Sequence, residues 1–155
     1  MSTWRDPQKW NAWLRGDDCP ICRAIGSDDA IAELELTRLM MPEAGPMRGY
    51  AWLPVRRHAI ELHDLTEPEG AALMRDLRRV SAAIAGVTGA VKLNYEIHGN
   101  TVPHLHVHLF PRYVGDRFEG RPIDPRAVTQ RVYAAGEHAE LTRRVRDALT
   151  EPDAR

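Results

Sequence analysis

The sequence of 155 residues has little cysteine, almost no net charge and no long hydrophobic run. Its two cysteines cannot form the disulfide framework that stabilises many small secreted domains. Lysine and arginine number 21 against 22 aspartates and glutamates, a net charge of −1, which gives no strong field to hold a nucleic acid. The longest run without charge or histidine, Val80–Val91, is far shorter than the ~20 residues of a membrane span. We therefore expect no nucleic-acid partner and no membrane partner.

The overall amino-acid composition is typical of one globular domain. Hydrophobic residues make up 43% of the chain and charged residues 28%, enough to bury a core and to keep a charged surface. The length also suits one domain, so we expect residues 1–155 to form a single domain. The first residues are polar and mix both signs of charge, a pattern that fits neither a signal peptide nor a transit peptide. We expect a cytoplasmic location.

A short helix rich in tryptophan is predicted near the start of the chain. Asp6 is a suitable N-cap, and Pro7 at the first helical position opens a segment that ends near Gly16. Trp10 and Trp13 would lie on one face of it. This pattern favours an anchor helix docked on the core or on a second subunit over aromatic stacking on a ligand.

The rest of the chain indicates an α+β fold with an antiparallel sheet, a long packing helix and further helices at both ends. Thr66 and Glu69 form a capping box, and an apolar stripe follows at steps of three and four: Leu73, Leu77, Val80, Ile84 and Val87. The remaining patterns predict strands over 31–41, 50–53, 91–97 and 104–110, and helices over 125–135 and 137–149. The helices over 125–135 and 137–149 would form a C-terminal helical extension.

The segment His104–Phe110, HLHVHLF, alternates imidazole with aliphatic side chains. A strand would turn the aliphatic residues to the core and align His104, His106 and His108 on the other face, roughly 7 Å apart. Idle histidines on a solvated face are disfavoured, because their ring nitrogens would need partners wherever they are partly buried. Two interpretations remain: a metal site, and an imidazole that attacks phosphorus, for which a pKa near ~6.5 is suitable.

Two further motifs offer chemistry. The turn at Gly99, Asn100 and Thr101 carries backbone N–H groups, an amide and a hydroxyl, the donors that phosphate oxygens accept. The pair Cys19 and Cys22, expected in the loop after the first helix, leaves metal binding and redox chemistry open.

Together these residues resemble the histidine triad (HIT) superfamily, whose signature alternates three histidines with apolar residues. The resemblance covers roughly residues 19–113 and includes the Cys-x-x-Cys pair, the basic segment Arg56–Ala59, the Asn-bearing strand and Pro111-Arg112 after the triad. It implies a nucleotide hydrolase or nucleotidyltransferase that cleaves at an α-phosphorus, usually a homodimer joined through an extended antiparallel sheet. The substrates it implies include nucleoside phosphoramidates and dinucleoside polyphosphates.

The resemblance also implies roles for individual residues. His106 would be the nucleophile that forms a nucleotidyl-histidine intermediate, and His108 would hydrogen-bond the phosphate or the leaving oxygen. The substrate-binding set would be Asn94, Gly99, Asn100, Thr101 and His108. Some bacterial relatives hold zinc with two cysteines and two histidines, which would make the ligand set Cys19, Cys22, His58 and His104. Four protein ligands close the coordination shell, so this zinc would be structural.

The sequence departs from the family pattern at two places. Tyr50 stands where many members have a fourth histidine, and a phenol, with a pKa near ~10, would keep only a hydrogen bond there. The segment Leu39–Glu43 lacks the aspartate that usually contacts ribose. Both departures favour a rival interpretation, a non-catalytic nucleotide-binding or zinc-stabilised interaction protein. A third interpretation is a metalloenzyme that uses His104, His106 and His108 as ligands.

Overall fold

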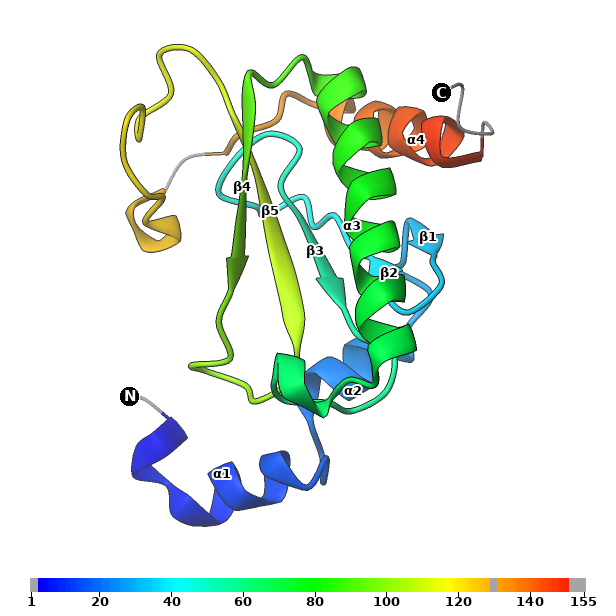
Figure 1. The fold of residues 1–155 in the computed structure, drawn as a ribbon. Coiled ribbons are helices and arrows are strands. Elements are labelled where there is room, and N and C mark those ends of the chain that lie inside the picture. Colours follow the sequence, from blue (N-terminus) through cyan, green and yellow to red (C-terminus); the bar gives the residue numbers. More distant parts are fainter. Residues whose placement is uncertain (1–2, 129–130, 151–155) are drawn as a thin grey trace.

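The predicted histidine strand is the central strand of a three-stranded antiparallel sheet in the order β3-β5-β4 (Figure 1). The computed structural model describes residues 3–128 and 131–150. Strand β3 spans Ala51–Pro54, β4 spans Lys92–Ile97 and β5 spans His106–Arg112. The strands predicted over 50–53 and 91–97 are thus confirmed within a residue or so. Strand β5 begins two residues later than predicted, because His104 lies in the segment before it.

One long helix, α3 (Glu67–Thr88), covers one face of this sheet (Figure 1). Both hydrogen bonds of the predicted capping box are present at Thr66, and Gly89 ends the helix in the left-handed conformation, with a φ of 70°. The predicted stripe faces the sheet, where Leu73, Val80 and Ile84 are buried. A 3-10 turn, η2 (Leu62–Asp64), leads into the helix.

The strand predicted over 31–41 is wrong: this segment forms two short antiparallel strands, β1 (Ala32–Glu33) and β2 (Arg38–Leu39). The buried carboxylate of Asp76 on α3 holds the turn between them. It accepts hydrogen bonds from the backbone N–H groups of Glu35, Leu36 and Thr37 and from the Thr37 hydroxyl, at 2.9–3.0 Å. A turn whose N–H groups are paired by a side chain from another element leaves no signal in the local sequence.

The C-terminal helix α4 (Glu137–Thr150) confirms the prediction over 137–149 and packs on α3 through Leu141, Val145 and Leu149. The helix predicted over 125–135 is wrong for the described residues, where only a 3-10 turn, η3 (Pro125–Ala127), forms. Residues 129–130 lie outside the described part. Tyr133 is buried beyond this turn, and its hydroxyl accepts a hydrogen bond from the Gly49 N–H, which anchors this segment without a helix.

The N-terminal helices are η1 (Thr3–Arg5), α1 (Pro7–Leu14) and α2 (Pro20–Ile25). Asp6 caps α1 as predicted, because its side chain accepts a hydrogen bond from the Lys9 N–H. No residue of α1 is buried, and the helix lies beside the rest of the fold (Figure 1). The expected docking of this helix on the core is therefore wrong, while docking on a second subunit stays a prediction. Among the described helices, none is long and apolar enough to cross a membrane.

We expect Asp76→Ala to lower the free energy of unfolding by about 2–4 kcal/mol, because it leaves buried N–H groups without an acceptor. Urea unfolding followed by circular dichroism measures this change. The control, Asp147→Ala, removes an exposed ion pair with Arg143 and should cost less than about 0.5 kcal/mol. Equal losses in the two variants would contradict this account of the turn.

Candidate functional site

His106 and His108 lie side by side on the sheet face opposite α3. Their ring centroids are 4.7 Å apart, and both side chains are partly exposed, whereas the alternating residues Val107 and Leu109 are buried. The alternation predicted for the strand is thus present over His106–Leu109, and Phe110 is buried as well. His104 departs from the predicted row, because its side chain is fully buried before the strand begins.

Hydrogen bonds fix which ring nitrogens carry protons. Nδ1 of His106 lies 2.6 Å from the backbone carbonyl of His104, which can only accept, so this nitrogen donates. Nε2 of a neutral His106 then carries the lone pair, and it lies 3.1 Å from Nε2 of His108, which must donate to it. Nδ1 of His108 is left to accept from the Tyr50 hydroxyl at 2.8 Å. The chain Tyr50–His108–His106 therefore presents an unprotonated nitrogen at His106.

Burial keeps all three groups neutral near pH 7. It lowers the pKa of His106 and lowers the pKa of His108 to about 4. Burial, with a smaller contribution from the charge of Glu96, raises the pKa of Tyr50 to about 12. An imidazole that is neutral at pH 7 is a nucleophile, whereas an imidazolium is not.

The turn predicted to contact phosphate lies at the same end of the sheet as His106, since it joins the end of β4 to the start of β5. Asn100 and Thr101 are exposed, and Gly99 adopts a φ of 117°, which favours glycine. The hydroxyl of Thr3 donates to the carbonyl of Thr101 at 2.9 Å and ties the N-terminal segment to this turn.

Asn94 lies on the same face as the histidines, farther along the sheet from the turn. The strand register sets it opposite Phe110, and its Oδ1 accepts a hydrogen bond from Arg112 at 2.8 Å. Arg112 is in turn fixed by an ion pair with Asp116, whose side chain is only 6% exposed. Asn94 therefore has its amide nitrogen, and not its oxygen, to offer to a ligand.

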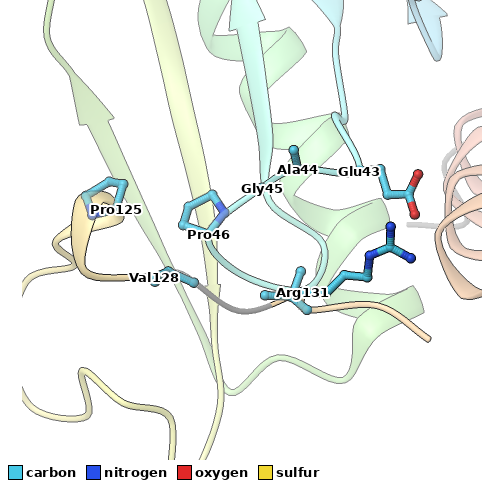
Figure 2. A pocket seen from close by; sticks show the side chains of 8 residues that line it. Glu43, Ala44, Gly45, Pro46, Pro125, Val128 and Arg131 are labelled. Atoms are coloured by element: carbon cyan, nitrogen blue, oxygen red, sulfur yellow. The ribbon is translucent and has the colours of Figure 1, made fainter.

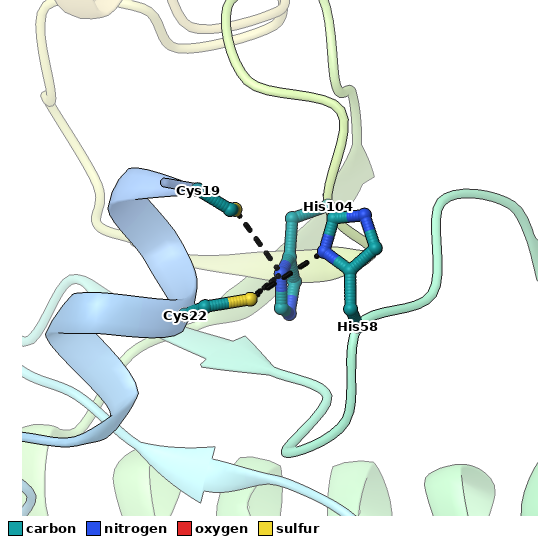
Figure 3. A group of neighbouring side chains, drawn as sticks. All are labelled: Cys19, Cys22, His58 and His104. Atoms are coloured by element: carbon teal, nitrogen blue, oxygen red, sulfur yellow. Dashed lines mark hydrogen bonds between the residues drawn. The ribbon is translucent and has the colours of Figure 1, made fainter. Parts of the chain in front are cut away.

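The four predicted metal ligands come together in the structure (Figure 3). Cys19 lies in the loop after α1, as expected, and is the N-cap of α2, whereas Cys22 lies within α2, so the expected loop position is wrong for Cys22. His58 follows β3 and His104 precedes β5. The four ligand atoms lie within 4.8 Å of one another, and the sulfur-to-Nδ1 distances are 3.4–3.6 Å. The edges of a tetrahedral zinc site with these ligands are about 3.5 Å.

The outer nitrogens of the two histidines also fit metal binding. Nε2 of His104 donates to the carbonyl of Val55 at 2.8 Å, and Nε2 of His58 donates to the carbonyl of Leu14 at 3.3 Å. Both rings therefore direct an Nδ1 lone pair at the cysteine sulfurs, the arrangement in which protein histidines hold metals. Within the described residues this is the only group of three or more side chains that could hold a metal ion, and it excludes His106 and His108.

Sequence reasoning missed Glu96, which pairs directly across the sheet with His108. Its carboxylate accepts a hydrogen bond from Nε2 of His98 at 2.9 Å. Both residues line a pocket of about 550 Å³ beside His108. The alternation of Asn94 and Glu96 on β4 is the signal that could have found it, once the register was known.

A second pocket, of about 650 Å³, adjoins the first and shares Pro46 and Pro125 with it (Figure 2). It lies between the turn Glu43–Pro46 and the side chains of Val128 and Arg131. None of the site residues predicted from the sequence lines this pocket.

A family model, a related sequence and solved structures are each similar to this chain. The family model of the HIT domain matches residues 27–115. A bis(5'-adenosyl)-triphosphatase of Saccharomyces cerevisiae is 36% identical over 73 residues, which cover 41% of this chain and only 35% of that relative. The crystal structure of a histidine triad protein from Bradyrhizobium japonicum superposes with a TM-score of 0.69 at 33% identity, covering 77% of this chain and 89% of that one. A Zn-bound histidine triad family protein from Mycobacterium smegmatis gives 0.62 at 26% identity, covering 84% and 92%.

We expect nitrogen-15 NMR to find His108 as the neutral Nε2–H tautomer from about pH 5 upward, because its pKa is lowered to about 4 and the ring is charged only below that value. Tyr50→Phe removes the donor to Nδ1, so the spectrum should shift toward the Nδ1–H tautomer. Tyr95→Phe, at an exposed position on the other face of β4, should leave the spectrum unchanged. An Nδ1–H tautomer in the unaltered protein would contradict the hydrogen-bond chain.

Proposed function

This chain belongs to the histidine triad (HIT) family, and we propose that it is a nucleotide hydrolase or nucleotidyltransferase with His106 as the nucleophile. The observation that carries this proposal is the 2.6 Å hydrogen bond from Nδ1 of His106 to the His104 carbonyl, since it leaves Nε2 unprotonated. That lone pair accepts from the Nε2–H of His108 at 3.1 Å, and it would become free to attack when a substrate oxygen takes over this donor. The yeast relative, named for hydrolysis of a dinucleoside triphosphate, supports the substrate class.

The reaction would proceed in two displacements at the α-phosphorus. Nε2 of His106 attacks the phosphorus, a P–N bond forms, and the bond from phosphorus to the leaving group breaks. The leaving group departs with the bonding electron pair, and the nitrogen of a phosphoramidate takes up a proton from solvent as it leaves as an amine. The Nε2–H of His108 hydrogen-bonds the phosphoryl or leaving oxygen. The carbonyl of His104 stabilises the positive charge that develops on the His106 ring. Water then attacks the phosphorus and the P–N bond breaks. A proton passes to solvent and a nucleoside monophosphate is released. Inorganic phosphate in place of water would make the enzyme a transferase.

The substrate would be bound by the turn before β5, which contacts its phosphate, and by β4. Gly99 allows the backbone to approach, while Asn100 and Thr101 donate from exposed side chains. Asn94 would donate through its amide nitrogen, because Arg112 occupies its oxygen. We take nucleoside phosphoramidates and dinucleoside polyphosphates as the candidate substrates, and residues 1–155 as one HIT domain.

The two rival interpretations fit these contacts less well. A non-catalytic protein would not need the Tyr50–His108 hydrogen bond, which preserves the arrangement of the nucleophile although Tyr50 replaces a histidine. A metalloenzyme that used all three histidines of the motif would need their lone pairs to converge. Nδ1 of His104 instead faces the cysteines, away from such a centre.

We further propose that the ion held by Cys19, Cys22, His58 and His104 is zinc and that its role is structural. Two thiolates and two imidazoles are the donors that zinc prefers, and four protein ligands leave no open position for a substrate. Bound zinc would link α2 to the segment that follows β3 and to the segment that precedes β5. A reducing cytoplasm, the location we propose, would keep both cysteines free to ligate it.

We also propose a homodimer. Strand β4 is an edge of the sheet, and its residues Tyr95 and Ile97 are exposed apolar side chains. An unpaired edge next to exposed apolar groups favours strand pairing with a second copy.

We expect His106→Ala to lower the rate of monophosphate release from adenosine phosphoramidate or diadenosine polyphosphates by at least about a thousandfold, because no other group would carry the covalent step. Chromatographic product analysis measures the rate, and unfolding curves should be nearly unchanged. His63→Ala, at a side chain 84% exposed, is the control and should keep full activity. A fully active His106→Ala enzyme would refute the proposed mechanism.

We expect metal analysis of freshly purified protein to find one zinc ion per chain. Cys19→Ala and His104→Ala should lose the metal, and their thermal midpoints should fall, because a structural ion contributes its binding energy to folding. His63→Ala should retain the metal. Protein that is fully stable without any bound metal would contradict the structural role.

A further inference from the structure

We propose that Glu96 binds the ribose diol of the substrate's nucleoside, in the pocket of about 550 Å³ beside His108. This inference rests on the proposed function and names a specificity residue for it. The observation that carries it is the Glu96 carboxylate directly across the sheet from His108, in a pocket whose remaining lining is apolar and aromatic except for His98, His108 and a second carboxylate, Asp124. Pockets of this size commonly hold small ligands through apolar walls and a few polar groups.

The pocket lies beside His108 and reaches from His98, next to the phosphate-binding turn, to Phe110 on the same strand. Tyr50 and Phe110 form its aromatic floor, with ring centroids 5.1 Å apart, and Ile123 closes it from the loop after β5. Glu96 and His98 form its wall on the β4 side. A phosphate at His106 would therefore leave ribose beside Glu96 and a base over the aromatic rings.

The Glu96 carboxylate is positioned to accept hydrogen bonds. Its side chain is 22% exposed, and Nε2 of His98 donates to one of its oxygens, Oε2, at 2.9 Å. In the described part of the chain, His98 is its one hydrogen-bond partner, so Oε1 is available to a ligand. A carboxylate is an acceptor only, and a ribose 2′,3′-diol presents two hydroxyl donors next to each other.

The negative charge of Glu96 favours a nucleoside over a phosphate group as the occupant of this pocket. A carboxylate repels a phosphate group, so the anionic part of the substrate is directed to the turn and to His106 instead. Glu96 thus supplies a carboxylate to the β4 side of the site.

The test compares adenosine phosphoramidate with its 2′,3′-dideoxy analogue in the full-length protein. We expect the unaltered protein to prefer the ribose substrate by about ten- to hundredfold in kcat/KM, as for hydrogen bonds to a charged acceptor. Glu96→Ala should reduce this preference to less than about threefold, mainly through the ribose substrate. The matched control, Glu67→Ala, removes an exposed carboxylate from the first turn of α3 and should retain the preference.

Binding of the unreactive nucleosides adenosine and 2′,3′-dideoxyadenosine by calorimetry separates this inference from the proposed function. Glu96-dependent preference for adenosine supports the diol site even if no phosphoramidate is hydrolysed. A Glu96→Ala protein that retains the preference, or that loses both ligands equally, overturns it. The inference is also overturned if Glu96→Ala changes the relative rates for charged and uncharged amine leaving groups but leaves the preference for the ribose diol unchanged.

Discussion

The arrangement of the site depends on His104, which serves both histidine clusters at once. Its backbone carbonyl accepts the hydrogen bond from Nδ1 of His106, and its own Nδ1 points at the sulfurs of Cys19 and Cys22. Its Nε2 donates to the carbonyl of Val55, next to β3. A displacement of this residue would change the hydrogen bonding of His106, the proposed nucleophile, and the candidate metal site together.

Local sequence patterns predicted the elements that are stabilised by contacts between residues close together in the sequence. The capping box at Thr66 and the apolar stripe of α3 are visible in the sequence because each contact joins residues three or four apart. The turn that Asp76 holds could not be predicted, because its acceptor comes from a helix about 40 residues away. The helix expected over 125–135 failed for a similar reason, since Tyr133 is anchored by the N–H of Gly49.

The candidate site likewise has some features that the sequence predicted and others that it could not predict. The alternation of His106 and His108 follows from strand geometry. The resemblance to a family supplied the four candidate metal ligands, whose ligand atoms lie within 4.8 Å of one another in the structure. Their lone-pair directions depend on carbonyls of Val55 and Leu14 and were not visible in the sequence. Glu96 was missed because its place opposite His108 depends on the strand register, which no single segment specifies.

The stereochemistry of the reaction at phosphorus tests the central claim most directly. A substrate made chiral at its α-phosphorus by sulfur would be hydrolysed in oxygen-18 water, and the configuration of the thiophosphate product determined. Attack by His106 followed by attack by water consists of two in-line displacements, each of which inverts the centre, so our account predicts overall retention. Overall inversion would mean that water attacks the substrate directly, and would contradict the nucleotidyl-histidine intermediate.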